Sequence, residues 1–171
     1  MTGTATPTGP NAYVELNFRP NVQLVSTVRR FVSEFYQKAL GDPDGTARVA
    51  LATHELLENA VKYSIDGDTT IRIEVTSGDA PRSVSIVLRN RTDEVHLATI
   101  RELLDGIAKA PDAFTFYQKL IASKAKTKEG SGLGLARICA EGEMTIALRV
   151  IEGDIVELTA TTTVPAPGGQ P

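Results

Sequence analysis

The 171-residue sequence has few of the residues that form covalent or metal cross-links. It contains one cysteine, Cys139, so an internal disulfide is excluded. With only two histidines beside this single thiol, the sequence also lacks the ligands of a thiolate–imidazole zinc site. The fold must therefore depend on a hydrophobic core. A chain of this length with 42% apolar residues is expected to form that core as a single domain.

The sequence also lacks an excess of positive charge and a long apolar run. Lys and Arg number 18 against 21 Asp and Glu, a formal net charge of −3, so nucleic acid is not an expected partner. No apolar stretch reaches membrane-spanning length, and the first ten residues lack the apolar core of a signal peptide. We therefore expect a cytoplasmic protein that binds neither nucleic acid nor membrane.

Hydrophobic periodicity predicts one α+β domain over residues 13–163. Alternating apolar residues predict strands, and apolar residues spaced by three and four predict helices. Glycine and proline are concentrated near both ends, which predicts disordered tails over residues 1–12 and 164–171. The expected strands are 13–19, 69–76, 83–89, 144–151 and 155–163, and the expected helices are 21–40, 43–64, 94–123 and 132–143.

The order of these elements predicts a two-layer sandwich. Strands that follow one another in pairs cannot form a doubly wound parallel sheet, so we expect a mixed β-sheet with the helices on one face. The long region 94–131 between the third and fourth strands is expected to be a lid or binding loop. Its aromatic residues Phe114, Phe116 and Tyr117 are compatible with local core and with a protein-binding patch.

A first set of candidate functional residues lies in the second predicted helix. Glu55, Asn59 and Lys62 stand at i, i+4 and i+7 and so share one helix face. These groups suit a Mg²⁺-phosphate site: the amide oxygen binds the ion, the carboxylate orients or deprotonates a nucleophile, and the ammonium offsets phosphate charge. The alternative is a solvated helix face with an acid–base pair worth a few tenths of a kcal/mol.

A second candidate is the glycine-rich segment 129–138, at the start of the last predicted helix. Alternating Gly130, Gly132 and Gly134 let backbone N–H groups approach an anion, and the helix dipole adds to the attraction. The spacing fits neither a dinucleotide-binding fingerprint nor a Walker loop. The alternative interpretation is a flexible loop before a helix.

Together, Glu-x-x-x-Asn on the second helix and Gly-x-Gly-Leu-Gly-Leu before the last helix resemble the GHKL ATPase superfamily of gyrase, the ninety-kilodalton chaperone, histidine kinases and mismatch-repair ATPases. The resemblance implies a histidine-kinase-like ATPase fold with ATP and Mg²⁺ as cofactors. It implies that Glu55 is the general base and Asn59 the Mg²⁺ ligand. It also implies that the remaining cofactor-binding positions are Lys62, Gly130, Gly132, Leu133 and Gly134.

Within the superfamily, the sequence is most similar to small stand-alone bacterial regulators such as anti-sigma-factor serine kinases. This implies a cytosolic regulator in a partner-switching pathway that acts as a serine kinase or an anti-sigma-type regulator. The expected partner is a protein: an antagonist, a sigma factor, a response-regulator domain or a second copy of this chain. The sequence leaves open whether the protein is an enzyme. The alternative is a non-catalytic protein-binding module that keeps the fold without binding ATP.

The sequence departs from the superfamily after the third strand. There the superfamily has Asp-x-Gly-x-Gly, whose Asp binds the adenine amino group, whereas this sequence has Asn90-Arg91-Thr92 and no glycine. The oxygen of Asn90 can accept a hydrogen bond, but without the strength that a carboxylate charge adds. Arg91 and Thr92 are expected to add bulk where the base would approach. We therefore expect weak adenine recognition.

Overall fold

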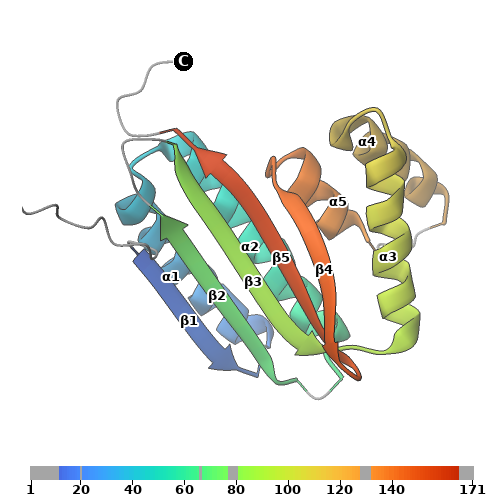
Figure 1. Ribbon diagram of the computed structural model, residues 1–171, viewed down its shortest axis with the longest axis horizontal. Coiled ribbons are helices and arrows are strands. Elements are labelled where there is room, and N and C mark those ends of the chain that lie inside the picture. Colours follow the sequence, from blue (N-terminus) through green and yellow to red (C-terminus); the bar gives the residue numbers. More distant parts are fainter. Residues whose placement is uncertain (1–11, 20, 66, 77–80, 128–131, 166–171) are drawn as a thin grey trace, which may run out of the picture.

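The computed structural model describes residues 12–19, 21–65, 67–76, 81–127 and 132–165. In these residues the chain forms five strands and five helices (Figure 1). In chain order they are β1 (Ala12–Phe18), α1 (Val22–Leu40), α2 (Pro43–Tyr63), β2 (Thr69–Thr76), β3 (Arg82–Arg91), α3 (Glu94–Lys109), α4 (Ala113–Thr127), α5 (Leu133–Ala140), β4 (Thr145–Glu152) and β5 (Ile155–Val164).

The strands form one sheet in the order β1-β2-β3-β5-β4. The α+β class is confirmed, but all pairings among the described strands are antiparallel, where we expected a mixed sheet. β3 and β4 run in the same direction, but β5 lies between them and is antiparallel to both. The insertion of β5 is therefore the reason why no parallel pair forms in this part of the chain.

The sheet is apolar on one face, and α1 and α2 lie behind it on that side (Figure 1). Alternate residues of β2 and β3, among them Ile73 and Ile86, are fully buried on this face. The core also takes in the apolar stripe of α1, which includes Val32 and Tyr36. Burial of these side chains is the main stabilising contribution to a two-layer sandwich.

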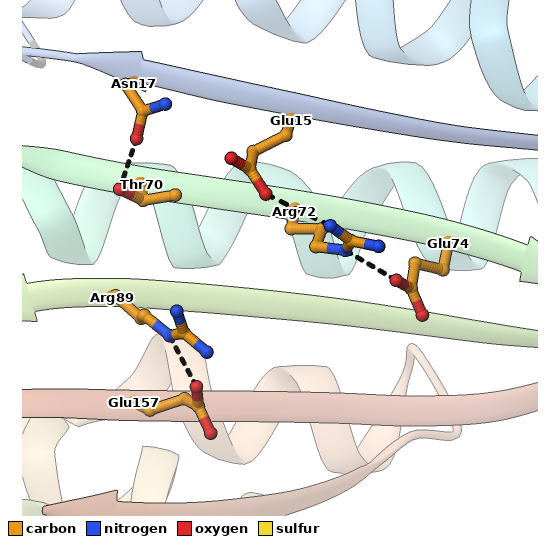
Figure 2. A network of polar contacts seen from close by, with 7 residues as sticks. All are labelled: Glu15, Asn17, Thr70, Arg72, Glu74, Arg89 and Glu157. Carbon is orange, nitrogen blue, oxygen red and sulfur yellow. Dashed lines mark hydrogen bonds and ion pairs between the residues drawn. The ribbon is translucent and has the colours of Figure 1, made fainter. Parts of the chain in front are cut away.

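The opposite face of the sheet is polar and carries a network of charges (Figure 2). The Arg72 guanidinium lies between the carboxylates of Glu15 and Glu74, at 3.3 and 2.5 Å. Glu157 on β5 accepts from Arg89 at 2.6 Å and pairs with Arg149 of β4 at 2.8 Å. Helices α1 and α2 and this charge network are thus on opposite sides of the sheet, as a half-buried sheet requires.

Helices α1 and α2 agree with the predicted ranges to within one residue at each end. Asn21 caps α1 by accepting from the backbone N–H of Leu24 at 2.9 Å, and Gly41 ends it in the left-handed region at φ 63°. Asp42 caps α2 by accepting from Gly45 N–H at 2.7 Å. None of the helices in the described ranges has the length and apolarity needed to cross a membrane.

Region 94–131 differs in detail from the sequence prediction. The single helical stretch expected over 94–123 is two helices, α3 and α4, because Pro111 cannot continue a helix and the carboxylate of Asp112 accepts from Thr115 N–H to start the next. Helix α5 ends at Ala140, three residues before the predicted end, and the predicted last residue, Glu143, is not helical because its φ is 52°.

Two residues assigned to tails belong to the sheet. Ala12 pairs with Val75 at the start of β1, and Val164 pairs with Arg82 at the end of β5. Hydrogen bonding to a neighbouring strand extends both β1 and β5 by one residue beyond the range predicted from apolar alternation. Apart from Ala12, Val164 and Pro165, the predicted tails lie outside the described residues.

Candidate functional site

The two sequence motifs meet where α5 packs against α2. Glu55 and Asn59 stand one turn apart on α2, and Gly134 is the second residue of α5. A Cβ atom on Gly134 would lie 2.7 Å from Glu55 Oε2 and 3.7 Å from Asn59 Nδ2. Glycine is therefore what lets the backbone of α5 approach these two polar side chains.

Helix α5 follows a glycine, Gly132, which has φ 86° in the left-handed region. Among the described residues no side chain caps the first turn of α5. Leu133 is the first helical residue. Free N–H groups and the positive end of the helix dipole make such a terminus suitable for an anion. Gly130, the first glycine of the motif, lies outside the described residues.

One polar atom of Asn59 is unpaired in the described structure. Its Nδ2 is buried and has no hydrogen-bond partner among the described residues. An unpaired buried donor costs roughly 1–3 kcal/mol, which a bound acceptor would recover. The other end of the amide is an oxygen of the kind that binds Mg²⁺. An amide oxygen, a free donor and a close glycine backbone together fit a Mg²⁺-phosphate group.

Arg137 of α5 is a neighbour of Glu55 that the sequence motifs did not identify. Its Nη1 donates to Glu55 Oε1 at 3.0 Å, and its Nε donates to Glu141 Oε2 at 2.7 Å. The hydrogen bonds to Glu141 and Glu55 raise the pKa of Arg137. Only the spacing of Arg137 and Glu141 by four residues is visible in the sequence. The contact with Glu55 depends on the packing of α5 against α2.

The aromatic residues of α4 have different surroundings. Tyr117 is half-buried, and burial together with the charge of Glu141 raises the pKa of its hydroxyl. Phe116 is half-buried, and its ring would contact a Cβ atom on Gly106 of α3 at 2.7 Å. Phe114 is 53% exposed. Phe116 and Tyr117 therefore fit the local-core alternative. Phe114 is exposed, so for this residue the alternative of a protein-binding patch stays open.

Lys62 lies on α2 beyond Asn59 and is exposed. Its ammonium stands 5.0 Å from the centre of the Tyr63 ring. Tyr63 in turn stacks on His96 of α3, with ring centroids 3.7 Å apart. Burial lowers the pKa of His96, an effect that the Lys62 charge reinforces and Asp93 opposes. These three residues connect the end of α2 to the start of α3.

Asn90 lies near the end of β3 on the inner face of the sheet and is 8% exposed. Its Nδ2 donates to the carbonyl of Arg91 at 3.1 Å. Thr92 is buried, whereas Arg91 is exposed and pairs with Asp154. The expectation that Arg91 adds bulk beside Asn90 is therefore wrong, because the side chains of successive strand residues point to opposite faces of the sheet.

A family model described as the histidine kinase-like ATPase domain matches residues 18–140, which include Glu55, Asn59 and Gly134. The fold is also similar to that of a chain in the crystal structure of the SiaB–SiaC complex from Pseudomonas aeruginosa, with a TM-score of 0.61. That match covers 88% of this chain and 89% of the other, at 15% sequence identity. No curated protein sequence matches this chain. The family match agrees with the fold and with the meeting of both motifs: the chain belongs to the histidine kinase-like ATPase domain family.

Proposed function

We propose that this domain binds Mg-ATP between α2 and the start of α5. The observation that carries the proposal is the juxtaposition of Glu55, Asn59 and Gly134, with a buried Asn59 donor that has no partner among the described residues. An amide oxygen and a close helix N-terminus supply the ion and phosphate contacts that such a ligand needs.

The roles follow from the chemistry of each group. The Asn59 oxygen would bind Mg²⁺, and the N–H groups of Gly132, Leu133 and Gly134 would donate to phosphate oxygens. In the described part of the chain no cluster of three or more His, Cys, Asp or Glu side chains could hold a metal. The ion would therefore need oxygens of the nucleotide as further ligands, and it would supply neutralisation of the phosphate charge.

We further propose that the domain is a bacterial cytosolic regulator that works with a protein partner in a partner-switching pathway. The SiaB–SiaC structure is that of a protein complex, and this supports a protein partner here. As a serine kinase, the protein would use Glu55 as the base that removes the proton of the acceptor hydroxyl. Transfer of labelled phosphate from ATP to a co-purified protein is the measurement that separates a kinase from a binding protein.

Asn90 favours a second candidate function. Its amide already donates to a backbone carbonyl, and it has no carboxylate charge with which to hold an adenine amino group. A protein-binding module that has lost ATP binding would be compatible with this position. Such a module would bind the same partner with equal affinity in the presence and absence of Mg-ATP.

Asn59→Ala tests the nucleotide site. The change removes the Mg²⁺ ligand, so calorimetry should show Mg-dependent ATP affinity falling by about tenfold or more. Thermal stability should not fall by more than about 2 °C, because the Nδ2 that is lost has no hydrogen bond in the described structure.

Glu58→Ala is the matched control, because Glu58 is adjacent on α2 and its side chain is 60% exposed. This variant should keep the ATP affinity of the unmodified protein. A large loss of stability in Asn59→Ala with unchanged ATP affinity would show that Asn59 has a structural role only.

A further inference from the structure

Arg137 is the cation in contact with the carboxylate at the candidate site. The Glu55 side chain is 13% exposed, and its Oε1 accepts from Arg137 at 3.0 Å. Its Oε2 faces the backbone of Gly134, next to the start of α5. A carboxylate in that position would repel a phosphate from the helix terminus unless its charge were offset.

The guanidinium is fixed from two sides. Its Nε donates to Glu141 at 2.7 Å, and its Nη1 donates to Glu55 at 3.0 Å. The planar fork of arginine can hold both acids at once, which a lysine could not do in the same geometry. Because Oε1 of Glu55 is held by this fixed group, the direction of Oε2 is fixed as well.

We propose that Arg137 is a positioning residue that neutralises and orients Glu55, so that the start of α5 can accept an anion. The proposal rests on the nucleotide site proposed above. In this proposal Arg137 acts through Glu55 and does not contact the ligand. An ordinary helix-stabilising role would involve Glu141 alone, since Glu141 is the partner on the same helix.

The charge balance between Glu55 and Arg137 gives a rescue test. Arg137→Gln leaves Glu55 without its counter-charge, so calorimetry should show weaker binding of Mg-ATP by about five- to tenfold. Mg-tripolyphosphate, a probe without a base, should lose affinity by the same factor. The double variant Glu55→Gln/Arg137→Gln removes both charges and should return both affinities to within about twofold of the unmodified protein.

Arg149→Gln is the matched control. Arg149 also pairs with a largely buried glutamate, Glu157 at 2.8 Å, but it lies on the polar face of the sheet. This variant should bind both probes with unchanged affinity. An equal loss in Arg137→Gln and in the double variant would overturn the proposal, because Arg137 would then act without Glu55. Unchanged binding in Arg137→Gln would overturn it too.

A failure of the proposed function itself gives a different pattern. If the unmodified protein binds neither probe, the nucleotide site is wrong, and the ion pair is then judged by urea unfolding of the same variants. Removing one member of a partly buried pair destabilises more than removing both. A lower midpoint in Arg137→Gln that the double variant restores would support the positioning of Glu55. Equal midpoints in the two variants would refute it.

Discussion

Tyr36 and Thr53 form a buried hydroxyl pair between α1 and α2. Tyr36 is 0% exposed, and its hydroxyl lies 2.9 Å from Thr53 Oγ1. Because the Thr53 hydroxyl donates to the carbonyl of Val49 at 2.8 Å, the proton between the two residues comes from Tyr36. Burial raises the pKa of Tyr36, because the charged phenolate is disfavoured away from water.

We expect Thr53→Ala to destabilise the protein more than Tyr36→Phe. Thr53→Ala leaves the Tyr36 hydroxyl buried without an acceptor and should cost about 1–3 kcal/mol, whereas after Tyr36→Phe the threonine keeps Val49 and the cost should be about 1 kcal/mol. Urea unfolding at pH 7 measures both values. A smaller loss in Thr53→Ala would contradict the assignment of the proton.

The same pair predicts a dependence on alkaline pH. A phenol with a raised pKa in the folded state gives stability that is complete below about pH 10, the ordinary pKa of tyrosine, and is lost as the pH rises above it. Urea midpoints measured between pH 8 and 11 should therefore fall less steeply in Tyr36→Phe than in the unmodified protein. Parallel curves would argue against the buried neutral phenol.

Residue spacing predicted part of the candidate site. The i, i+4 relation of Glu55 and Asn59 depends only on helix geometry, and both residues lie at the contact with Gly134. Lys62 has the same helical relation, yet its ammonium lies over Tyr63, a preference for an aromatic ring that spacing does not reveal. Arg137 could not be assigned to Glu55 because the two residues are 82 positions apart.

At the scale of elements, the contact between α2 and α5 depends on Gly134. Alanine is the better helix former by about 1 kcal/mol, but its Cβ atom would lie 2.7 Å from Glu55 Oε2. The carboxylate cannot simply turn aside, since its Oε1 is bound to Arg137. At position 134 the close packing of α2 and α5 therefore favours glycine, although alanine has the higher helix propensity.

We expect Gly134→Ala to destabilise the protein by about 1–3 kcal/mol despite its gain in helix propensity. In a Glu55→Ala background the same change should be neutral or stabilising, because the crowded oxygen is absent. Chemical denaturation of the four proteins measures this coupling. An equal effect of Gly134→Ala in both backgrounds would show that Glu55 is not the obstacle.

Local patterns predicted the elements better than their arrangement. Apolar alternation located β2 and β3 to within two residues, because each has one face in the core. The position of β5 between β3 and β4 is set by long-range hydrogen bonding, which no local period encodes. The break at Pro111 was readable from the sequence, since proline cannot continue a helix, but apolar spacing on both sides concealed it.

At the scale of the whole molecule, nucleotide binding should raise thermal stability. At Mg-ATP concentrations about 100-fold above the dissociation constant, the linkage gain is about 2.7 kcal/mol, or roughly 5–10 °C for a chain of this size. Mg-GTP should raise the midpoint to within about 5 °C of the Mg-ATP value, because Asn90 offers at most one neutral hydrogen bond to distinguish the bases.

Thermal scans with each nucleotide, with and without EDTA, check this expectation. Chelation of Mg²⁺ should remove most of the shift if Asn59 acts through the ion. A strong shift with ATP and none with GTP would show that residues other than Asn90 recognise adenine. Absence of a shift with either nucleotide would instead favour the protein-binding module.

The place of β5 in the sheet has a consequence for how the chain acquires its structure during synthesis. β5 is the last of the described strands to leave the ribosome, yet it joins β3 to β4. Until it pairs, β1, β2 and β3 can form one sheet with α1 and α2, while β4 and α5 have no strand that links them to it. Glu55 and Asn59 belong to the first unit and Gly134 and Arg137 to the second. We therefore expect the nascent chain to form this scaffold first and to secure β4 in the sheet only after β5 has paired.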